Sequence, residues 1–282
     1  MLKSLDRTIA SSSERIVFLA PSVLSLTDTI PNVHVDGDRY AELVRDVQGF
    51  RGGIYLKDGA IQPHQLTPDG LHLTEEDDNS WHMLLLDKQR RVSACALYLE
   101  HGDDVKFDDL RVRHCSMARD AEWRPKLVSA VETELDRARN EGLRYVELGG
   151  WAVSEESRGT AGPLALALAV YGFSRRGAGA LGMTTATFRH CSATILKRLG
   201  GSRFEVDGET LPPYFESKYR CLMELLRFDS RRPNPKYLGL IDQVRDTLDK
   251  ITVIARPAAA SLASLGTLSP GAALYAPRAL AS

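Results

Sequence analysis

Residues 147–163 read ELGGWAVSEESRGTAGP and predict a strand, then a tight polar turn, then the start of an apolar helix that runs from Pro163 to Phe173. Such a turn leaves backbone N–H groups without partners at the N-terminus of the helix, where they can bind an anion. An acidic side chain, Glu147, lies on the strand just before the turn. The stretch therefore places a candidate proton acceptor close to a candidate phosphate site.

The composition is that of a soluble globular chain. Of the 282 residues, 43% are hydrophobic and 26% are charged, and the net charge of −1 predicts no general attraction to nucleic acid or anionic membranes. The four cysteines are widely spaced and the histidines show no metal-ligand spacing, so we expect reduced thiols and no metal. No apolar stretch reaches the ~20 residues of a membrane-spanning helix. We therefore predict a cytoplasmic protein without a membrane span.

Three segments are expected along the chain. Residues 1–35 lack hydrophobic periodicity and are predicted to be irregular. Residues 36–255 are predicted to form a single domain. Residues 256–282 are rich in Ala, Ser and Pro and have little large apolar surface to bury, so we predict a disordered tail.

Hydrophobic periodicity predicts alternating strands and helices between residues 36 and 255. Helices are expected at 38–50, 120–140, 163–173, 192–199 and 236–254, with Gly52 and Gly53 ending the first of them. Strands are expected at 81–86, 92–99, 109–115, 144–153, 182–188 and 219–228, with a short one at 54–56. The pattern is typical of an α/β (α+β) domain in which helices flank a central sheet.

Several short motifs, taken in order, resemble those of GNAT acyltransferases, and most of all the branch of N-acyl amino acid synthases and acyl-homoserine-lactone synthases. Residues 147–153 are similar to the E-x-S-R-x-A-V strand of that branch. Residues 51–59 are similar to its R-x-x-V-Y…G segment, residues 78–82 to its acidic segment, and residues 198–200 to its late R-x-x-G helix end. Two positions differ from the pattern. Gly150 stands where the branch has Arg. The phosphate turn of the wider family has the pattern R-x-x-G-x-G/A, whereas residues 158–163 here read RGTAGP and end in Pro163.

The resemblance implies a GNAT-like fold, with a central mixed, largely antiparallel sheet that is splayed at the acyl-donor cleft, between the strand of Glu147 and the strand of Gly182. Pantetheine adds to the splayed strand much as a peptide strand would. The implied reaction moves an acyl group from a phosphopantetheine thioester, on coenzyme A or on an acyl carrier protein, to a small-molecule amine such as an amino acid. Two alternatives stay open: an acyl-homoserine-lactone autoinducer synthase, and a non-catalytic module that binds acyl groups or coenzyme A.

Glu147 has two interpretations. It is either one half of an ion pair, for example with Arg144, or the base that accepts the amine proton. A carboxylate among residues of the buried type is costly as a purely structural charge. Together with the resemblance, this cost favours the base.

The resemblance also implies the donor-binding residues. Trp151 and Val153 lie on the splayed strand, where backbone groups would hold the thioester, although core packing explains Trp151 equally well. Arg158 lies next to the phosphates in the family pattern. The backbone N–H groups that form a nest for phosphate are those of Gly159, Thr160, Ala161 and Gly162.

The general acid is less well defined. The usual GNAT tyrosine falls at about Leu196 and is absent, so His190, Cys191 or Tyr214 would have to replace it. His190 lies between a strand and a helix, either as a residue that bonds to backbone at the helix entry or as a proton shuttle.

Arg and Lys side chains gather around the later helices, at 175–176, 189 and 197–198. Such a cluster is either a solvated surface or a docking patch for an acidic acyl carrier protein. No nucleic-acid partner is expected, and the sequence predicts no particular oligomeric state.

Overall fold

The structure, a computed structural model, describes residues 15–22, 30 and 32–257. Its strands are β1 (Arg15–Leu19), β2 (Val33–Val35), β3 (Trp81–Leu86), β4 (Val92–His101), β5 (Arg144–Val153), β6 (Ala180–Thr187), β7 (Ser202–Arg203), β8 (Glu205–Val206), β9 (Glu209–Thr210), β10 (Tyr214–Glu216), β11 (Cys221–Asp229) and β12 (Thr252–Ala255). Its α-helices are α2 (Gly37–Lys57), α3 (Trp123–Asn140), α4 (Gly162–Ser174), α5 (Ser192–Leu199) and α6 (Pro235–Arg245). Short 3₁₀ helices are η1 (Pro63–Gln65), η2 (Phe107–Asp109), η3 (Arg111–His114), η4 (Met117–Arg119), η5 (Arg189–Cys191) and η6 (Leu248–Lys250).

Ten strands form one sheet in the order β10-β11-β6-β5-β4-β3-β1-β12-β2, with β7 paired to β11. Three neighbouring pairs are parallel, namely β1 with β12, β12 with β2, and β5 with β6. The other neighbours are antiparallel. The predicted mixed, largely antiparallel sheet with flanking helices is therefore confirmed.

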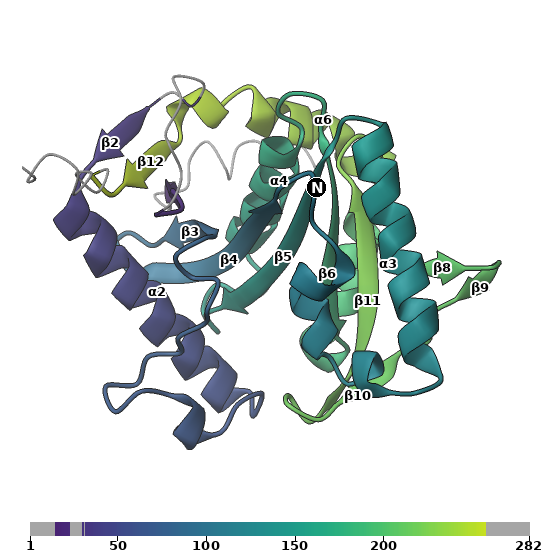
Figure 1. Ribbon diagram of the computed structural model, residues 1–282. Helices are drawn as coiled ribbons and strands as arrows, with labels where there is room; N and C mark the ends of the chain where they lie inside the picture. Colours follow the sequence, from purple (N-terminus) through teal and green to yellow (C-terminus); the bar gives the residue numbers. More distant parts are fainter. Residues whose placement is uncertain (1–14, 23–29, 31, 258–282) are drawn as a thin grey trace, which may run out of the picture.

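The helices divide the interior into three cores. Helices α4 and α6 pack on one face of the sheet, over a core that includes Ala94, Ala96 and Val146. Helices α2 and α3 cover the other face, at opposite ends of the sheet (Figure 1). Strand β5 runs beneath both of them, because Tyr145 belongs to the α3 core and Ala152 to the α2 core. The stretch of β5 between these two residues lies at the junction of the two cores.

Helix α2 is longer than predicted. It begins where the Asp36 side chain accepts a hydrogen bond from the Arg39 N–H at 2.9 Å, and it runs to Lys57. The expectation that Gly52 and Gly53 end the helix is wrong, and so is the strand predicted at 54–56. Gly52 is explained by a close approach, since a Cβ there would lie 2.9 Å from the carbonyl oxygen of Gly70.

The strand predicted at 109–115 is also wrong, because this segment forms η2 and η3. The backbone N–H groups of Arg111 and Val112 donate to the carboxylate of Glu147 instead of to a neighbouring strand. Leu110 and Val112 are buried in the α3 core. The alternation of apolar and polar residues at 109–115 thus comes from a 3₁₀ turn with one side buried and the other exposed.

The two ends of the described chain differ from prediction as well. Residues 15–19 and 33–35, expected to be irregular, form β1 and β2, and the helix predicted at 236–254 ends at Arg245. Residues 252–255 instead form β12 between β1 and β2. These strands depend on pairing across more than 200 residues, which local periodicity does not reveal. Residues 258–282, most of the predicted tail, lie outside the described residues.

Candidate functional site

The sheet opens between β5 and β6. The two strands pair from Arg144 opposite Ala180 to Leu148 opposite Thr184. Beyond that point β5 remains paired with β4, while β6 remains paired with β11 as far as Thr187. The predicted separation of the Glu147 and Gly182 strands is confirmed, and it begins after Leu148, the residue that follows Glu147.

A β-bulge lies where the strands separate. Gly149 is opposite Leu97 and Ala152 is opposite Cys95, so Gly150 and Trp151 together face a single residue of β4. Gly150 has a φ of +60°, and a Cβ there would lie 2.6 Å from Cγ of Leu97. Gly150 is therefore required by the bulge, which leaves local backbone groups outside the ladder.

Glu147 is buried and held by three donors. Its carboxylate accepts hydrogen bonds from the N–H groups of Arg111 at 2.9 Å and Val112 at 3.3 Å, both at the start of η3. The Nε2 atom of His101, the last residue of β4, lies 3.1 Å from the same carboxylate. His101 was not predicted as a site residue, and it is recognisable only once the register of β4 against β5 is known.

Arg111 brings a positive charge to the bulge. Its Nη1 atom lies 2.5 Å from where a Cβ of Gly149 would be, so the absence of a side chain at Gly149 makes room for the guanidinium. Its Nε atom lies 3.3 Å from Glu76. The guanidinium of Arg111, on η3, thus lies beside the glycines of β5. The acyltransferase branch that the sequence resembles has an Arg at one of these positions, Gly150.

Tyr55 and His72 border the same region from the α2 side. The Tyr55 hydroxyl donates to the carbonyl oxygen of Trp151 at 3.3 Å, and its ring meets that of His72 edge to face at 5.5 Å. Burial and the nearby guanidinium of Arg51 lower the pKa of His72 to about 4, so its imidazole is neutral at pH 7. Arg51 is buried and lies 3.0 Å from the Asp77 carboxylate, which fastens the loop of His72 to α2.

The turn before α4 has the features of an anion site. Gly159 adopts a φ of +81°, Ala161 has no side-chain cap, and the first turn of α4 contains no acid. Within the described part of the chain, the N–H groups of Gly159, Ala161 and Gly162 donate no hydrogen bond to a protein group. The N–H of Thr160 differs from its neighbours, because it donates to the Ser157 carbonyl at 3.2 Å.

Arg158 and His190 meet at the C-terminal end of α2. Arg158 Nη2 lies 3.0 Å from the Asp58 carboxylate, and His190 Nε2 lies 3.3 Å from it. Lys57 pairs with Glu155 of the turn at 2.7 Å. The structure therefore brings His190 together with Arg158, through Asp58, while the imidazole that contacts Glu147 is that of His101.

Trp151 is the second residue of the bulge on β5, and Val153 lies two residues after it. Their side chains are half-buried and pack against the α4 core, as the core-packing interpretation of Trp151 expected. Core packing therefore accounts for much of the side-chain surface of both residues.

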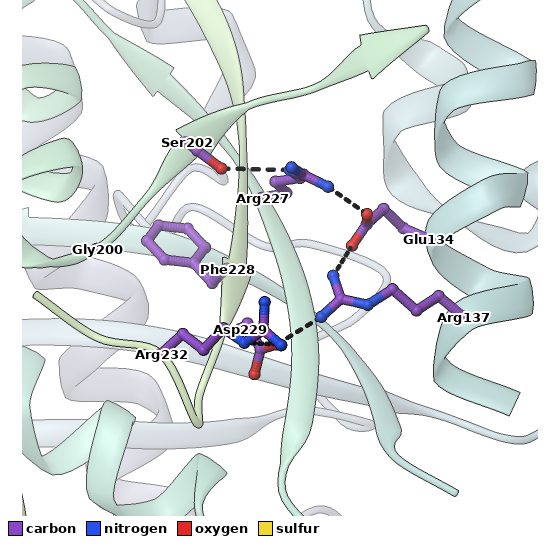
Figure 2. Close-up of a pocket in the computed structure, with 8 residues that line it drawn as sticks. All are labelled: Glu134, Arg137, Gly200, Ser202, Arg227, Phe228, Asp229 and Arg232. Atoms are coloured by element: carbon purple, nitrogen blue, oxygen red, sulfur yellow. Dashed lines mark hydrogen bonds and ion pairs between the residues drawn. The ribbon is translucent and has the colours of Figure 1, made fainter. Parts of the chain in front are cut away.

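A separate pocket of about 140 Å³ lies between α3 and β11 (Figure 2). Its charges are already paired, since Glu134 accepts hydrogen bonds from Arg227 and Arg137, and Asp229 accepts one from Arg137 at 2.6 Å. It adjoins the end of β6 that is paired with β5, because Phe228 is opposite Gly182. We therefore place the candidate site at the opening of the sheet and not in this pocket.

Among the residues that the structure describes, no helix is long and apolar enough to cross a bilayer. In the same residues, no group of three or more His, Cys, Asp or Glu side chains is arranged to hold a metal ion.

No protein-family model matches the chain, and no curated protein matches it. Solved structures do. BjaI, a CoA-dependent acyl-homoserine lactone synthase with SAM and isopentyl-CoA, matches with a TM-score of 0.52 and 13% identity, over 86% of this chain and 92% of that chain. FeeM, an N-acyl amino acid synthase from uncultured soil microbes, matches with a TM-score of 0.44 and 12% identity, over 70% of this chain and 88% of that chain. The chain thus has a GNAT-like fold, as its motifs predicted.

Proposed function

We propose that this protein transfers an acyl group from a phosphopantetheine thioester to an amine. One observation carries the proposal: the pairing of β5 with β6 ends at Leu148, between a buried carboxylate, Glu147, and the bulge at Gly150 and Trp151. The gap offers an unpaired strand edge to a pantetheine chain. The carboxylate lies close to where an amine would meet the thioester.

The donor phosphate would bind at the turn before α4. The N–H groups of Gly159, Ala161 and Gly162, which donate to no protein group among the described residues, would bind a phosphate oxygen. Arg158 adds a charge once it exchanges Asp58 for the phosphate. Both candidate donors carry this phosphate on pantetheine.

Coenzyme A is the donor that we favour. The basic cluster considered for an acyl carrier protein is largely engaged within the chain: Arg175 pairs with Asp242 at 2.7 Å, and Lys197 pairs with Glu224. Burial lowers the pKa of Arg176 to about 10, and its guanidinium lies 3.4 Å from the centre of the Phe173 ring. Little of the cluster remains for an acidic partner.

In the proposed reaction the amine nitrogen bonds to the thioester carbon and forms a tetrahedral oxyanion. The carbon–sulfur bond then breaks, and the electron pair leaves with the sulfur as thiolate. Glu147 accepts the amine proton, directly or through water or His101, and returns it to solvent. The His101 contact at 3.1 Å makes the imidazole a second group able to carry that proton.

The acceptor is proposed to be a small amine such as an amino acid. The side of the bulge that faces α2 and η3 presents both signs of charge, with Arg111 beside Glu76 and Glu147. A zwitterion can satisfy both signs. The alternatives are autoinducer synthesis with S-adenosylmethionine as acceptor and a module that binds the donor without turnover.

The test uses purified protein, acetyl-CoA, longer acyl-CoA donors, an acyl carrier protein donor and a pool of amino acids, with release of free thiol as the signal. Glu147→Gln keeps the shape of the side chain and removes the base, so we expect turnover to fall about 10²- to 10⁴-fold. The matched control is Glu134→Gln, which alters a buried, paired carboxylate of α3 far from the gap. Mass spectrometry of the product separates an acylated amino acid from a lactone.

Equal thiol release by wild type and Glu147→Gln would rule out the assigned base. Binding of coenzyme A without turnover of any donor would favour the module. A folded protein that binds no thioester and no coenzyme A would contradict the proposal as a whole.

A further inference from the structure

Tyr55 is the side chain through which α2 reaches the bulge. Its hydroxyl donates to the carbonyl oxygen of Trp151 at 3.3 Å, and Trp151 is one of the two bulge residues. The bond is longer than the usual O–H···O distance of about 2.7–2.8 Å. The hydroxyl is thus held at the edge of the gap by a weak bond that a better acceptor can replace.

A backbone N–H points into the same gap. The N–H of Ser154 donates to the carbonyl oxygen of Ser93 on β4 at 2.9 Å. In an antiparallel ladder, consecutive residues direct their backbone groups to opposite sides. The N–H of Val153 therefore points away from β4, toward the gap that β6 leaves. The Tyr55 hydroxyl and the Val153 N–H are two donors on one edge of β5.

The surroundings of Tyr55 suit its hydroxyl to donate a hydrogen bond and not to give up its proton. Burial raises the pKa of the Tyr55 hydroxyl, and the opposing effect of Arg51 and Arg111 is smaller. A free thiol has a pKa of about 8.5, so transfer of the phenolic proton to a leaving thiolate is uphill. The oxyanion of the tetrahedral intermediate is an alkoxide, which is far more basic than a thiolate. It is therefore a good hydrogen-bond acceptor for a phenol that keeps its proton.

Other tyrosines do not offer this geometry. The hydroxyls of Tyr40, Tyr145, Tyr171 and Tyr214 are buried without a hydrogen-bond partner among the described residues. Tyr214, one of the acids considered from the sequence, belongs to the α3 core. Tyr219 is half-buried and close enough to Tyr55 to influence its pKa, which makes it a useful control.

We infer that the Tyr55 hydroxyl is an oxyanion donor of this site and acts beside the backbone N–H of Val153. The inference rests on the proposed acyl transfer. As the amine nitrogen bonds to the carbonyl carbon, the C=O π pair moves onto oxygen, and the Tyr55 hydroxyl turns from Trp151 to that oxygen. When the C=O bond re-forms, the C–S bond breaks and its pair leaves with sulfur. Tyr55 keeps its proton throughout.

The kinetic test compares Tyr55→Phe and Tyr219→Phe with wild type, each with an alkyl thioester donor, acetyl-CoA, and with an aryl thioester donor whose thiolate needs no proton. Removal of one oxyanion donor costs about 10²- to 10³-fold in kcat. We expect a loss of about 10²-fold for Tyr55→Phe with both donors, little change in KM, and near wild-type rates for Tyr219→Phe. A loss seen with acetyl-CoA alone would make Tyr55 a proton donor and overturn the inference. Equal rates for both variants would also overturn it.

A binding test is independent of the acceptor. A trifluoromethyl ketone analogue of acetyl-CoA presents an oxyanion-like hydrate, whereas coenzyme A does not. We expect Tyr55→Phe to weaken binding of the analogue at least tenfold and to leave the affinity for coenzyme A unchanged. Equal weakening of both ligands would show a packing role and contradict the inference. If wild type binds the analogue no better than coenzyme A, there is no oxyanion hole. If wild type binds neither, the proposed function itself fails.

Discussion

The two faces of β5 differ in kind. On the face toward α4, Val146 lies in a continuous apolar core, and the cavity beside it measures only about 10 Å³. On the face toward α2 and α3, Glu147 and Gly149 lie where two cores meet, and polar side chains from η3 and β4 reach them. One face of β5 is thus stabilised by apolar packing against α4, while the other face positions charged groups.

The bulge connects the two faces. Gly150 absorbs the extra residue in β5 through its positive φ, while Leu97 occupies the space that a side chain would need. The same bulge turns Trp151 and Val153 back toward the α4 core. Variants of β5 and its neighbours therefore test whether the two faces have different roles.

The largest effect is expected for Gly150→Ala. A Cβ at φ +60°, 2.6 Å from Leu97, combines backbone strain with overpacking, and we expect a loss of about 3–5 kcal/mol in the free energy of unfolding. The control is Gly159→Ala, at φ +81° with no atom within 4 Å of the Cβ position, where about 1 kcal/mol is expected. Urea denaturation measures both. Similar losses at the two positions would show that the bulge is not tightly packed.

The second prediction separates the faces directly. Val146→Ala removes packing from the α4 core and is expected to cost about 2–3 kcal/mol in unfolding free energy, while the Glu147 side of the strand keeps its fold. Glu147→Gln retains a hydrogen-bond acceptor for η3 and is expected to cost about 1–2 kcal/mol. Denaturation and thiol-release assays on both variants should show opposite rankings, since Val146→Ala loses more stability and Glu147→Gln loses more activity. If the same variant lost more in both stability and activity, the two faces would not have the different roles assigned to them.

A third effect concerns pH. Neutral His72 accepts a hydrogen bond from Arg51 Nε at 3.2 Å, and protonation would place two cations side by side. Because the folded pKa of His72 is about 4, below the usual value of about 6.5, its contribution is complete above pH 6.5 and declines as the pH falls toward 4. We expect about 2 kcal/mol of unfolding free energy to be lost between pH 7 and pH 4 through this group.

His72→Asn should flatten that part of the pH dependence, whereas His34→Asn, at an exposed histidine, should leave it unchanged. Urea denaturation at several pH values checks this. An unchanged slope in His72→Asn would assign the pH dependence to other groups.

The smallest effect is expected at Asp58, which joins the end of α2 to Arg158 in the turn before α4 and to His190. Asp58→Asn weakens contacts with Arg158 and His190 that are partly exposed, and we expect a loss below about 1 kcal/mol in stability. The same change frees Arg158 for phosphate, so affinity for coenzyme A should rise a few-fold. Calorimetric titration measures it, and weaker binding by the variant would mean that Asp58 positions Arg158 for the donor.

The turn before α4 was more predictable from the sequence than the rest of the candidate site. Its features are local: a glycine, Gly159, that adopts a positive φ, a proline at the start of a helix, and an apolar helix that follows. The pairing gap after Glu147 was also predicted, through the order of the motifs.

The groups around Glu147 were not predicted, because they come from distant segments. His101 depends on the register of β4, and Arg111 depends on a 3₁₀ turn in a segment whose alternation suggests a strand. Tyr55 depends on the continuation of α2 through Gly52 and Gly53, which local propensity opposes. Pairing and close packing over long sequence distances decide such features, and a single sequence gives them no local signal.

The proposed donor site consists of the gap beside the bulge and the turn before α4. Amide hydrogen exchange, measured with and without saturating coenzyme A, tests this site. We predict slower exchange at Val153, Gly159, Ala161 and Gly162, and unchanged exchange around the pocket between α3 and β11 (Figure 2). Coenzyme A binding that protects only the residues of that pocket, and leaves the bulge and the turn unprotected, would contradict it.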